Sequence, residues 1–445
     1  MHSIPGSWQG RALNGFVSGW AVALAACTAG AAGGEAFLAG ADLSHLKFFE
    51  DRGVVYREGG EAKDALVILK SRGLNCVRLR LFTSSAAQAF ADPYNAINNL
   101  EYAVPLAQRA KRAGLRLLLD FHYSDSWADP GKQTKPAAWQ SLAFDALEAQ
   151  VREYSRDCVA VFKAAGAMPD AVQVGNEIIG GMLWPEGRVG GAYDTPVQWA
   201  RLGRLLRAAI GGIRDAAGGS GPVVALHIDR GGDWGATQWF FDHVAQEQVE
   251  FDAIGQSYYP WWHGSVAALR ECLTRTASRY GKPVMLLETA FPWSGPDPAG
   301  GIPATPEGQV AFLVELARTL KGLPGDKGMG LFWWGAEYQA VPGLSLAGFN
   351  RRSFFNAEGD VLPVAGAVGQ LVAPVRLEAA LAGDSVTLLW PLSGAGMALT
   401  TSGDLGMDGG WSRVPDPVGH HGGMFTITRP LEADQSRFYR LEADR

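Results

Sequence analysis

Two glutamates, each at the end of a short apolar run, are the residues of this chain best placed for chemistry. Glu177 ends the segment AVQVGNE, and Glu288 ends VMLLE. A carboxylate at the carboxyl end of a buried parallel strand lies where barrel enzymes place their reacting groups. Paired carboxylates of this kind cleave glycosidic bonds, one as an acid and the other as a nucleophile. The pair therefore predicts a glycosidase.

The neighbours of the two glutamates favour distinct roles. Cleavage with retention needs two carboxyl groups roughly 5 to 5.5 Å apart. Asn176 supplies an amide for the sugar 2-hydroxyl, which favours Glu177 as the acid/base. Glu288 is then the nucleophile, and we expect Arg80 and the hydroxyl of Tyr258 to keep it ionised. The alternative interpretation is a pair of unrelated surface glutamates.

Polar side chains gather at the same ends of the other predicted strands. They are Asp42, His122, Tyr123, Asp125, His227, Asp229, Tyr258, Tyr259 and His263. The opposite ends carry mostly glycine, proline and apolar residues, so the polar ends mark the catalytic face. Any one of these histidines can instead be a structural hydrogen-bonding residue. The sequence has no histidine pair at metal-ligand spacing, no P-loop and no nucleophile elbow, and we expect no metal or other cofactor.

Eight strand-like runs alternate with helical segments and must position these residues. The expected strands span residues 37–44, 76–82, 116–123, 171–178, 222–229, 252–260, 283–291 and 330–338. The clearest helical periodicity spans 61–72, 100–113, 143–165, 197–217 and 308–320. This alternation predicts a closed (β/α)8 TIM barrel, with an open doubly wound sheet as the alternative. Glu177 then ends the fourth strand and Glu288 the seventh.

Length and composition fit one barrel with a small appended module. The chain has 445 residues, of which 47% are hydrophobic and 19% charged, and a single barrel takes roughly 250 residues. A net charge of -6 without a basic run argues against a nucleic-acid partner. The 15 tryptophans offer apolar faces on which sugar rings stack, although most belong to the core. A neutral or weakly charged substrate is therefore favoured, with a polysaccharide as the expected partner, and a monomer is the default.

The first 34 residues resemble an export signal. Arg11 precedes an apolar stretch, residues 16–26, that is too short to span a bilayer. The segment LAAC, which ends at Cys27, resembles the lipobox of bacterial lipoproteins, and ordinary cleavage within 29–32 is the alternative. We therefore expect an exported protein, extracellular, periplasmic or lipid-anchored at the cell surface, without a transmembrane segment. The remaining cysteines fit buried free thiols: Cys76, Cys158 and Cys272.

The last seventy or so residues follow a different pattern. Short alternating runs span 375–381, 385–391, 397–403, 424–430 and 437–442, separated by Gly, Asp and Pro. This pattern predicts a small β-sandwich-like module over residues 373–445, after a catalytic domain over residues 35–372. Trp390 and Trp411 are candidates for sugar binding, but the core of the module is the favoured place for both.

Motifs from the first strand to the eighth together carry a family resemblance. They are GADLS at 40–44, VRLRL at 77–81, DFHYSDSWADPGKQ at 120–133, QVGNEI at 173–178, LWPEG at 183–187, SYYPWWHG at 257–264 and LETAFPW at 287–293. The chain resembles arabinogalactan endo-β-1,4-galactanases of glycoside hydrolase family 53, which are retaining (β/α)8 enzymes with catalytic glutamates on strands four and seven. The third-strand and SYYPWW motifs are the most specific to this family.

The resemblance implies site residues, position by position. Glu177 becomes the acid/base and Glu288 the nucleophile. Around the sugar at the cleavage point it places Asp42, Arg80, His122, Asn176, His227, Tyr258 and Trp334. Arg78 has the same strand parity as Arg80, so the choice between these two arginines stays open. Candidate stacking platforms further along the bound chain are Trp184, Trp261 and Trp293.

Departures from the family pattern leave the substrate details open. The chain has Phe82-Thr83 where the family has a Trp, and Trp334 is followed by Gly-Ala in place of Glu-Pro. Some relatives hold calcium near the last loops, but no matching ligand set is recognised here. The number of subsites, and therefore the product length, is the property most affected by these departures. The alternatives are the same mechanism on another β-1,4-glycan, a mannan or a glucan, and a non-catalytic surface protein that binds galactan.

Overall fold

Eight parallel strands close into a barrel in the computed structural model of the chain, which confirms the predicted (β/α)8 fold. The structure describes residues 22–24, 37–219, 221–296, 298, 300–403, 410–431 and 437–443. The barrel strands neighbour one another in chain order, and the last pairs with the first. They are β2 (Leu38–Asp42), β5 (Cys76–Leu81), β6 (Arg116–Phe121), β7 (Ala171–Val174), β10 (Val223–Ile228), β11 (Ala253–Tyr258), β12 (Val284–Thr289) and β13 (Gly328–Trp333).

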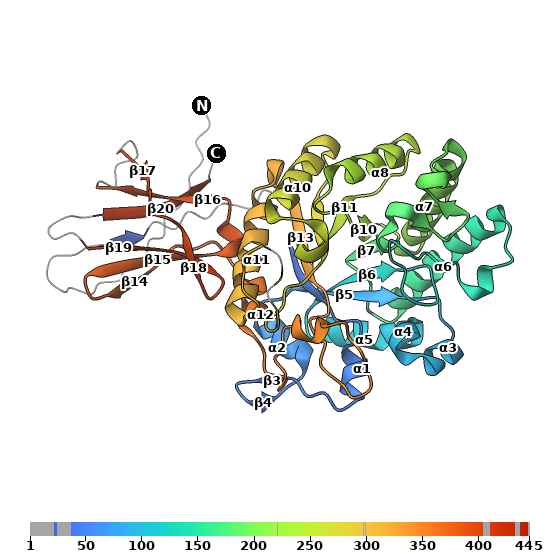
Figure 1. The fold of residues 1–445 in the computed structure, drawn as a ribbon, viewed down its shortest axis with the longest axis horizontal. Coiled ribbons are helices and arrows are strands. Elements are labelled where there is room, and N and C mark those ends of the chain that lie inside the picture. Colours follow the sequence, from blue (N-terminus) through green and yellow to red (C-terminus); the bar gives the residue numbers. More distant parts are fainter. Residues whose placement is uncertain are drawn as a thin grey trace.

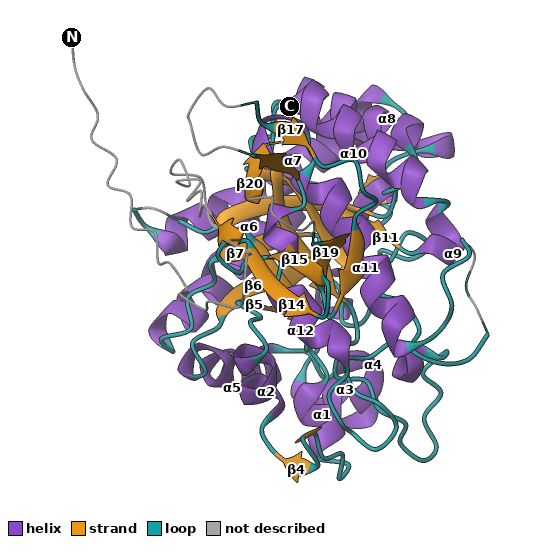
Figure 2. Ribbon diagram, turned by 90° about the vertical axis from the view of Figure 1, so that its left-hand side faces the viewer, coloured by secondary structure: helices purple, strands orange, loops and turns teal. Residues whose placement is uncertain are grey.

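Helices surround the strands (Figure 2). A main helix follows each barrel strand: α2 (Ala65–Ser71), α5 (Leu100–Arg112), α6 (Phe144–Ala164), α7 (Pro196–Ala217), α8 (Trp234–Gln246), α10 (Val266–Tyr280), α11 (Pro306–Lys321) and α12 (Pro363–Gly369). The connections contain shorter elements: α1 (Leu46–Glu50), α3 (Ala86–Ala91), α4 (Pro93–Ala96), α9 (Pro260–His263), and the hairpins β3 (Arg57–Glu58) with β4 (Glu61–Ala62) and β8 (Gly181–Met182) with β9 (Gly187–Arg188).

The barrel strands are apolar along most of their length because both of their faces are covered. β12 has the sequence VMLLET and is buried at every position, with helices on the outside and other side chains inside the barrel. Because the strands are parallel, their carboxyl ends meet at one mouth. Residues far apart in the chain therefore become neighbours there, as when the backbone N–H of His45 donates to Glu337 at 2.8 Å.

Several predicted elements have different bounds in the structure, among them the eighth strand, expected over 330–338 and observed as β13 (Gly328–Trp333). The helix expected from residue 61 begins at Ala65, because the side chain of Asp64 caps its first turn by accepting from the N–H of Leu66 at 2.7 Å. The strand expected to run through Ile178 ends at Val174. Gly175 and Glu177 follow with φ angles of 78° and 50°, a left-handed conformation that cannot continue an extended strand.

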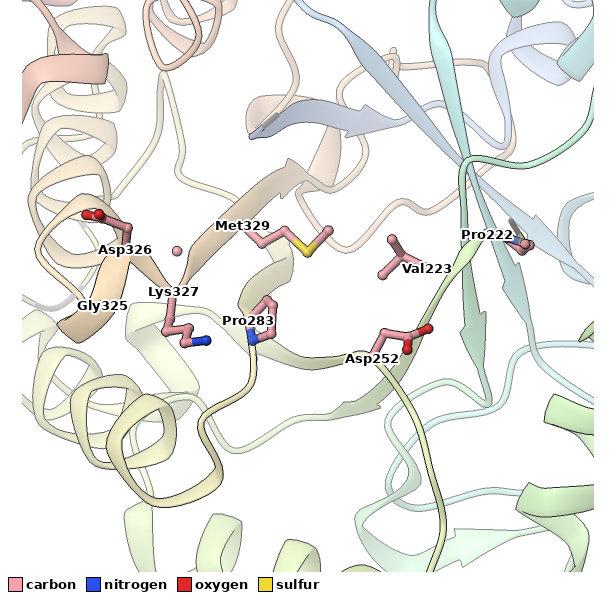
Figure 3. Close-up of a pocket in the computed structure, with 10 residues that line it drawn as sticks. Pro222, Val223, Asp252, Pro283, Gly325, Asp326, Lys327 and Met329 are labelled. Atoms are coloured by element: carbon pink, nitrogen blue, oxygen red, sulfur yellow. The ribbon is translucent and has the colours of Figure 1, made fainter. Parts of the chain in front are cut away.

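The opposite, amino-terminal end of the barrel contains a cavity of about 620 Å³ (Figure 3). Its lining includes residues that precede or begin β10, β11, β12 and β13: Pro222, Val223, Asp252, Pro283, Lys327 and Met329. Small side chains inside this end of the barrel, among them Ala171, Ala225 and Ala253, form a separate apolar cluster with their neighbours. The cavity therefore lies at the far end of the strands from the glutamates.

A module of two four-stranded sheets follows the barrel. One sheet has the order β14 (Glu378–Ala382), β15 (Ser385–Pro391), β19 (Met424–Pro430), β18 (Gly419–His421), and the other β1 (Val22–Leu24), β20 (Arg437–Ala443), β16 (Met397–Ser402), β17 (Ser412–Arg413). Alternate residues of β15 are buried, as expected for a sheet with one covered face. Trp390 is 1% exposed, so its predicted place in the core is confirmed, while Trp411 is half-buried beneath the guanidinium of Arg440.

The module packs against α11 and α12 of the barrel (Figure 1). Its buried residues, including Leu388 and Trp390, belong to the same apolar cluster as the barrel core. Gly423 touches α12 so closely that a Cβ there would lie 2.6 Å from Ala367. Hydrogen bonds cross the contact as well, for example from the Ser393 N–H to the carbonyl of Gln370 at 2.9 Å. Barrel and module therefore share one core.

Within the predicted export signal, the structure describes only Val22–Leu24, whose backbone pairs in parallel with β20. Cys27 and the alternative cleavage sites lie outside the described residues. Among the residues that are described, no helix is long and apolar enough to cross a membrane. Cys76, Cys158 and Cys272 are buried and free, which confirms their prediction as thiols.

Candidate active site

A sharp change in the backbone after β7 presents Glu177 at the carboxyl end of the barrel. Gly175 turns the chain with a φ of 78°, and a Cβ at this position would lie 2.5 Å from the side chain of Ile178. Glu177 itself adopts φ 50° and ψ 50°, which costs a non-glycine residue roughly 1 kcal/mol or more. Its side chain stays partly exposed and accepts a hydrogen bond of 2.6 Å from the hydroxyl of Ser257.

Glu288 occupies β12 across the barrel and has a cationic partner. Its Oε1 lies 2.9 Å from Nη2 of Arg78, and its Oε2 accepts from the hydroxyl of Tyr259 at 3.1 Å. Only 7% of the residue is exposed. Charge-assisted contacts of this kind stabilise the carboxylate form, which is the form a nucleophile needs.

The two carboxylates lie close enough to act on one bond. An oxygen of Glu177 and an oxygen of Glu288 lie within 4.8 Å of each other, and His227 places a ring nitrogen within the same distance of both. Separations of about 5 to 5.5 Å accompany retention, whereas inverting enzymes need about 6.5 to 9.5 Å to admit a water. The geometry favours direct attack by a carboxylate.

Arg78, on β5, contacts side chains from four other barrel strands. Its guanidinium contacts Asp42 of β2 and Asp120 of β6, each at 2.8 Å, in addition to Glu288 of β12. It also donates to the side-chain oxygens of Gln173 at 3.1 Å and Asn176 at 3.0 Å. A buried charge with this many partners fixes the geometry of the site, because losing one partner leaves a charge uncompensated.

Burial and the neighbouring charges give Glu177 and Glu288 different pKa shifts. Burial raises the pKa of Glu177 well above its usual range, and the negative charge of Glu288 raises this pKa further. Burial also raises the pKa of Glu288 to about 7, but Arg78 opposes that rise. A proton shared between interacting carboxyls therefore resides on Glu177, the member without a cationic contact.

Two predicted partners of Glu288 are wrong in the structure. We expected Arg80 and Tyr258, but Arg78 and Tyr259 hold these places. Side chains alternate between the two faces of a strand, and Tyr258 faces outwards, where it stacks on Phe312 of α11 and donates its hydroxyl to the carbonyl of Gly264 at 2.8 Å.

Arg80 belongs to a second cluster beside the first. Its Nη2 lies 2.8 Å from Nδ1 of His45 and 3.5 Å from Asp42, and its guanidinium lies over the ring of Trp127 at 4.2 Å. Although burial raises the pKa of Asp42, Arg80 and Arg78 outweigh it and leave this pKa below its usual value. Glu337 is fully buried near this cluster, and burial raises its pKa to about 8.

The predicted histidines are enclosed rather than exposed to a ligand. His122 accepts from the N–H of Ala128 at 2.9 Å, and its Nε2 lies 3.0 Å from Asp120. His227 is fully buried and contacts Gln173 and Ser257 through its two ring nitrogens. Both nitrogens of His227 are engaged, so the Glu177–His227–Glu288 group lacks a free imidazole lone pair for a metal ion. The expected absence of calcium or another cofactor stays a prediction.

The predicted tryptophans lie at the same mouth and are all partly buried. Trp334 contacts the rings of Trp127 and Phe349. Trp184 and Trp261 each have a guanidinium 4.2 Å from one ring, from Arg188 and Arg352. Trp293 joins the edge of the core cluster. Because of these contacts, only part of each tryptophan ring is accessible for stacking against a sugar.

The sequence analysis gave no site role to several residues that lie within its own motifs. They are Asp120, Gln173, Ser257 and Trp262, and Tyr259 was placed at the catalytic face without being assigned as the partner of Glu288. Trp262 is 63% exposed, which makes it the most accessible tryptophan in the SYYPWWHG segment. The alternation of inward and outward positions along β11 was the signal that could have identified Ser257 and Tyr259 as an inward-facing pair.

Fold and site together define a glycosidase of the (β/α)8 class, with its paired carboxylates at the carboxyl ends of strands four and seven. The sequence model described as glycosyl hydrolase family 53 matches residues 38–366. The chain belongs to this family.

Known relatives agree with this assignment. The chain is 36% identical over 309 residues to an arabinogalactan endo-β-1,4-galactanase of Thermothelomyces thermophilus, covering 66% of this chain and 88% of that protein. A solved fungal β-1,4-galactanase matches with a TM-score of 0.66 at 33% identity, covering 74% of this chain and 98% of that one. A family 53 catalytic domain from Ignisphaera aggregans matches with a TM-score of 0.68 at 32% identity, over 76% and 96%.

Proposed function

We propose that this protein is an endo-acting, retaining hydrolase of the β-1,4-galactosidic bonds in galactan, including the galactan of type I arabinogalactan. The observation that carries the proposal is the carboxylate pair within 4.8 Å, with a cation beside only one member. Membership of family 53 and the similarity to proteins named as β-1,4-galactanases support the choice of sugar.

The proposed reaction has two displacements at one carbon. Glu288 attacks the anomeric carbon while Glu177 transfers its proton to the glycosidic oxygen, so the bond to the departing chain breaks and a glycosyl ester forms. Glu177, now a carboxylate, takes a proton from water, whose oxygen attacks the same carbon and releases Glu288. Two inversions give net retention. Arg78 and Tyr259 contact Glu288 but not Glu177. The two glutamates are therefore not interchangeable, and we assign the nucleophile role to Glu288.

Other residues at the mouth are proposed to bind the sugar. Asn176 donates one amide hydrogen to the carbonyl of Ala128 at 2.8 Å, and we assign its second hydrogen to the sugar 2-hydroxyl. We assign stacking of sugar rings to the exposed parts of the tryptophans at this mouth: Trp184, Trp261, Trp262, Trp293 and Trp334. Asp42, Arg80, His122 and His227 support the site from positions beneath it, whereas Tyr258, on the outer face of β11, is given no role at the sugar.

The test is release of reducing ends from unbranched β-1,4-galactan by protein starting at about residue 35. β-Mannan, cellulose and xylan are assayed separately for comparison, and the Glu288→Ala variant serves as the blank. Activity on galactan alone, absent from the variant, is the expected result. Activity on mannan or cellulose instead would retain the mechanism and discard the sugar. Binding of galactan without turnover by the wild-type protein would identify a binding protein.

Domain limits and export are part of the proposal. We assign catalysis to residues 35–372, a supporting β module to residues 373–445, and an export signal to residues 1–34, with Cys27 as the lipid attachment site. Metabolic labelling with a fatty-acid analogue tests the attachment: incorporation lost in Cys27→Ser supports a lipid anchor, and secretion of unlabelled protein supports ordinary cleavage.

A further inference from the structure

A chain of hydrogen bonds ends on one oxygen of Glu177. The Ser257 hydroxyl lies 2.6 Å from Oε1 of Glu177, and Nε2 of His227 lies 2.9 Å from that hydroxyl. On the other side of the imidazole, Nδ1 lies 2.9 Å from the amide nitrogen of Gln173. Gln173, His227 and Ser257 are all fully buried, so solvent does not compete for these contacts.

Arg78 fixes the direction of this chain at its start. The guanidinium donates from Nε and Nη2 to the side-chain oxygen of Gln173, both at 3.1 Å. Because a guanidinium can only donate, the amide oxygen faces Arg78 and the amide nitrogen faces His227. The amide nitrogen can only donate, and its two hydrogens face three acceptors: Nδ1 of His227 at 2.9 Å, and the Gly175 carbonyl and the Asn176 side-chain oxygen at 3.1 Å each. The shortest of these contacts is the one to Nδ1, so we assign one hydrogen to it.

A competing contact at Nδ1 comes from Asn176, whose side-chain oxygen lies 3.1 Å away. This oxygen already accepts from Arg78 at 3.0 Å and from Gln173 at 3.1 Å. With both of its lone pairs engaged, it has little capacity for a third donor. Nδ1 is therefore the acceptor and Nε2 carries the hydrogen. Burial, with Arg78 next in importance, lowers the pKa of His227 well below its usual value, which keeps the ring neutral.

We propose that Gln173, His227 and Ser257 form a one-directional hydrogen-bond chain that holds Oε1 of Glu177 as an acceptor, so that Oε2 carries the proton exchanged in catalysis. Nε2–H donates to Ser257, and Ser257 can then only donate to Oε1. The inference rests on the proposed acid/base role of Glu177. Ser257 and His227 are positioning residues, because they act on the reacting bond through Glu177 alone.

Other charges also face Glu177 and must be kept constant in any test. Glu288 on β12 and Asp229 after β10 raise its pKa, while Arg78 on β5 lowers it. Tyr259, after β11, also interacts electrostatically with Glu177. None of these groups is changed when the Ser257 hydroxyl is removed, so the contribution of the chain can be measured separately.

The first arm of the test is the pH profile of Ser257→Ala. A donor to the carboxylate favours ionisation, so its removal keeps Glu177 protonated to higher pH. We expect the alkaline limb of kcat/KM to move up by about one to two pH units. Ser155→Ala is the matched control, because it removes an equally buried hydroxyl bonded to Tyr123 instead; its limb should not move. A uniform loss of kcat/KM with an unmoved limb would overturn the proposal.

The second arm replaces His227. In His227→Gln the amide N–H can stand in for Nε2–H, so the limb should stay near its wild-type position. His227→Phe removes the donor and frees Ser257 to rotate, and the limb should move up by less than in Ser257→Ala. Equal shifts in both His227 variants would contradict a role for the donated hydrogen.

The third arm needs no turnover, which separates this inference from the proposed substrate. Nitrogen-15 NMR of histidine-labelled protein, with His227→Gln to assign the signal, reports which ring nitrogen carries hydrogen. We expect Nε2–H and an unprotonated Nδ1 throughout the range in which the protein is folded. An Nδ1–H tautomer would overturn the chain even in an active galactanase. If the protein shows the expected tautomer but is inactive on galactan, the hydrogen-bond chain stands and the proposed substrate is rejected.

Discussion

Glu288 and Glu177 are the same residue type on opposite sides of one barrel mouth, and their surroundings differ in charge. Glu288 contacts a guanidinium and a phenol, whereas Glu177 contacts a serine hydroxyl. The cation favours the ionised form of Glu288, and the neutral donor lets burial and the charge of Glu288 keep a proton on Glu177. The difference teaches that two carboxyls of the same type acquire different proton affinities from the strands around them, and our proposed roles rest on that difference.

Of all the changes considered, removal of the Glu288 carboxylate, our proposed nucleophile, is expected to lower activity the most. Glu288→Ala should lower turnover of galactan by roughly five orders of magnitude, because no covalent intermediate can form. Circular dichroism and binding of a galactan oligosaccharide should show a folded protein that still binds. Glu101→Ala, an exposed substitution on α5, is the control. Activity close to wild type in Glu288→Ala would reject its role.

Removal of the acid should depend on the leaving group. Glu177→Ala is expected to slow hydrolysis of galactan by about 10²- to 10⁴-fold, since the glycosidic oxygen then departs without a proton. A nitrophenyl galactoside, whose leaving group needs little protonation, should lose far less in its first step. Pre-steady-state measurement of nitrophenol release distinguishes the two substrates. Equal losses on both would indicate that Glu177 acts in another way.

Arg78, which contacts Glu288, can be compared with Arg80, which lies two residues further along β5. Arg78→Lys keeps a charge but cannot reach Asp42, Asp120 and Glu288 together, so we expect kcat/KM to fall by about 10²- to 10³-fold and stability to drop by about 3 kcal/mol or more. Arg80→Lys should lose less activity, because Arg80 contacts His45 and Asp42 rather than Glu288. The reverse order of losses would reject the structural assignment.

The adjacent residues Tyr258 and Tyr259 can be compared by the same substitution, for which we expect a smaller loss of activity. Tyr259→Phe removes the donor to Glu288, and a bond to a charged group of this kind contributes about 1.5 to 3 kcal/mol. We expect kcat/KM to fall by roughly 10- to 100-fold. Tyr258→Phe makes the same chemical change one residue away, on the outer face, and should leave kcat/KM within about twofold. The pair of variants is measured on galactan at one pH.

These comparisons also show what could be predicted from the sequence. The apolar runs identified all eight barrel strands, because parallel strands covered on both faces need continuous apolar sequence. The positions of Glu177 and Glu288 followed from the strand count. The choice of Arg78 over Arg80 did not, because both point into the barrel and only packing decides which reaches Glu288. Ser257 was missed because a single serine becomes informative only after the inward-facing positions of β11 are assigned.

The smallest effect on chemistry is expected from the C-terminal β module, which has no described contact with either glutamate. Deletion of residues 374–445 should leave kcat on soluble galactan unchanged, since no module residue contacts the pair among the contacts described. It should lower the Tm by several degrees, because the deletion exposes apolar surface on α11 and α12. Differential scanning fluorimetry beside reducing-end assays measures both. A truncated protein that is folded but inactive would mean that the module holds the carboxylates in place through α11, and their different surroundings would then depend on the whole chain.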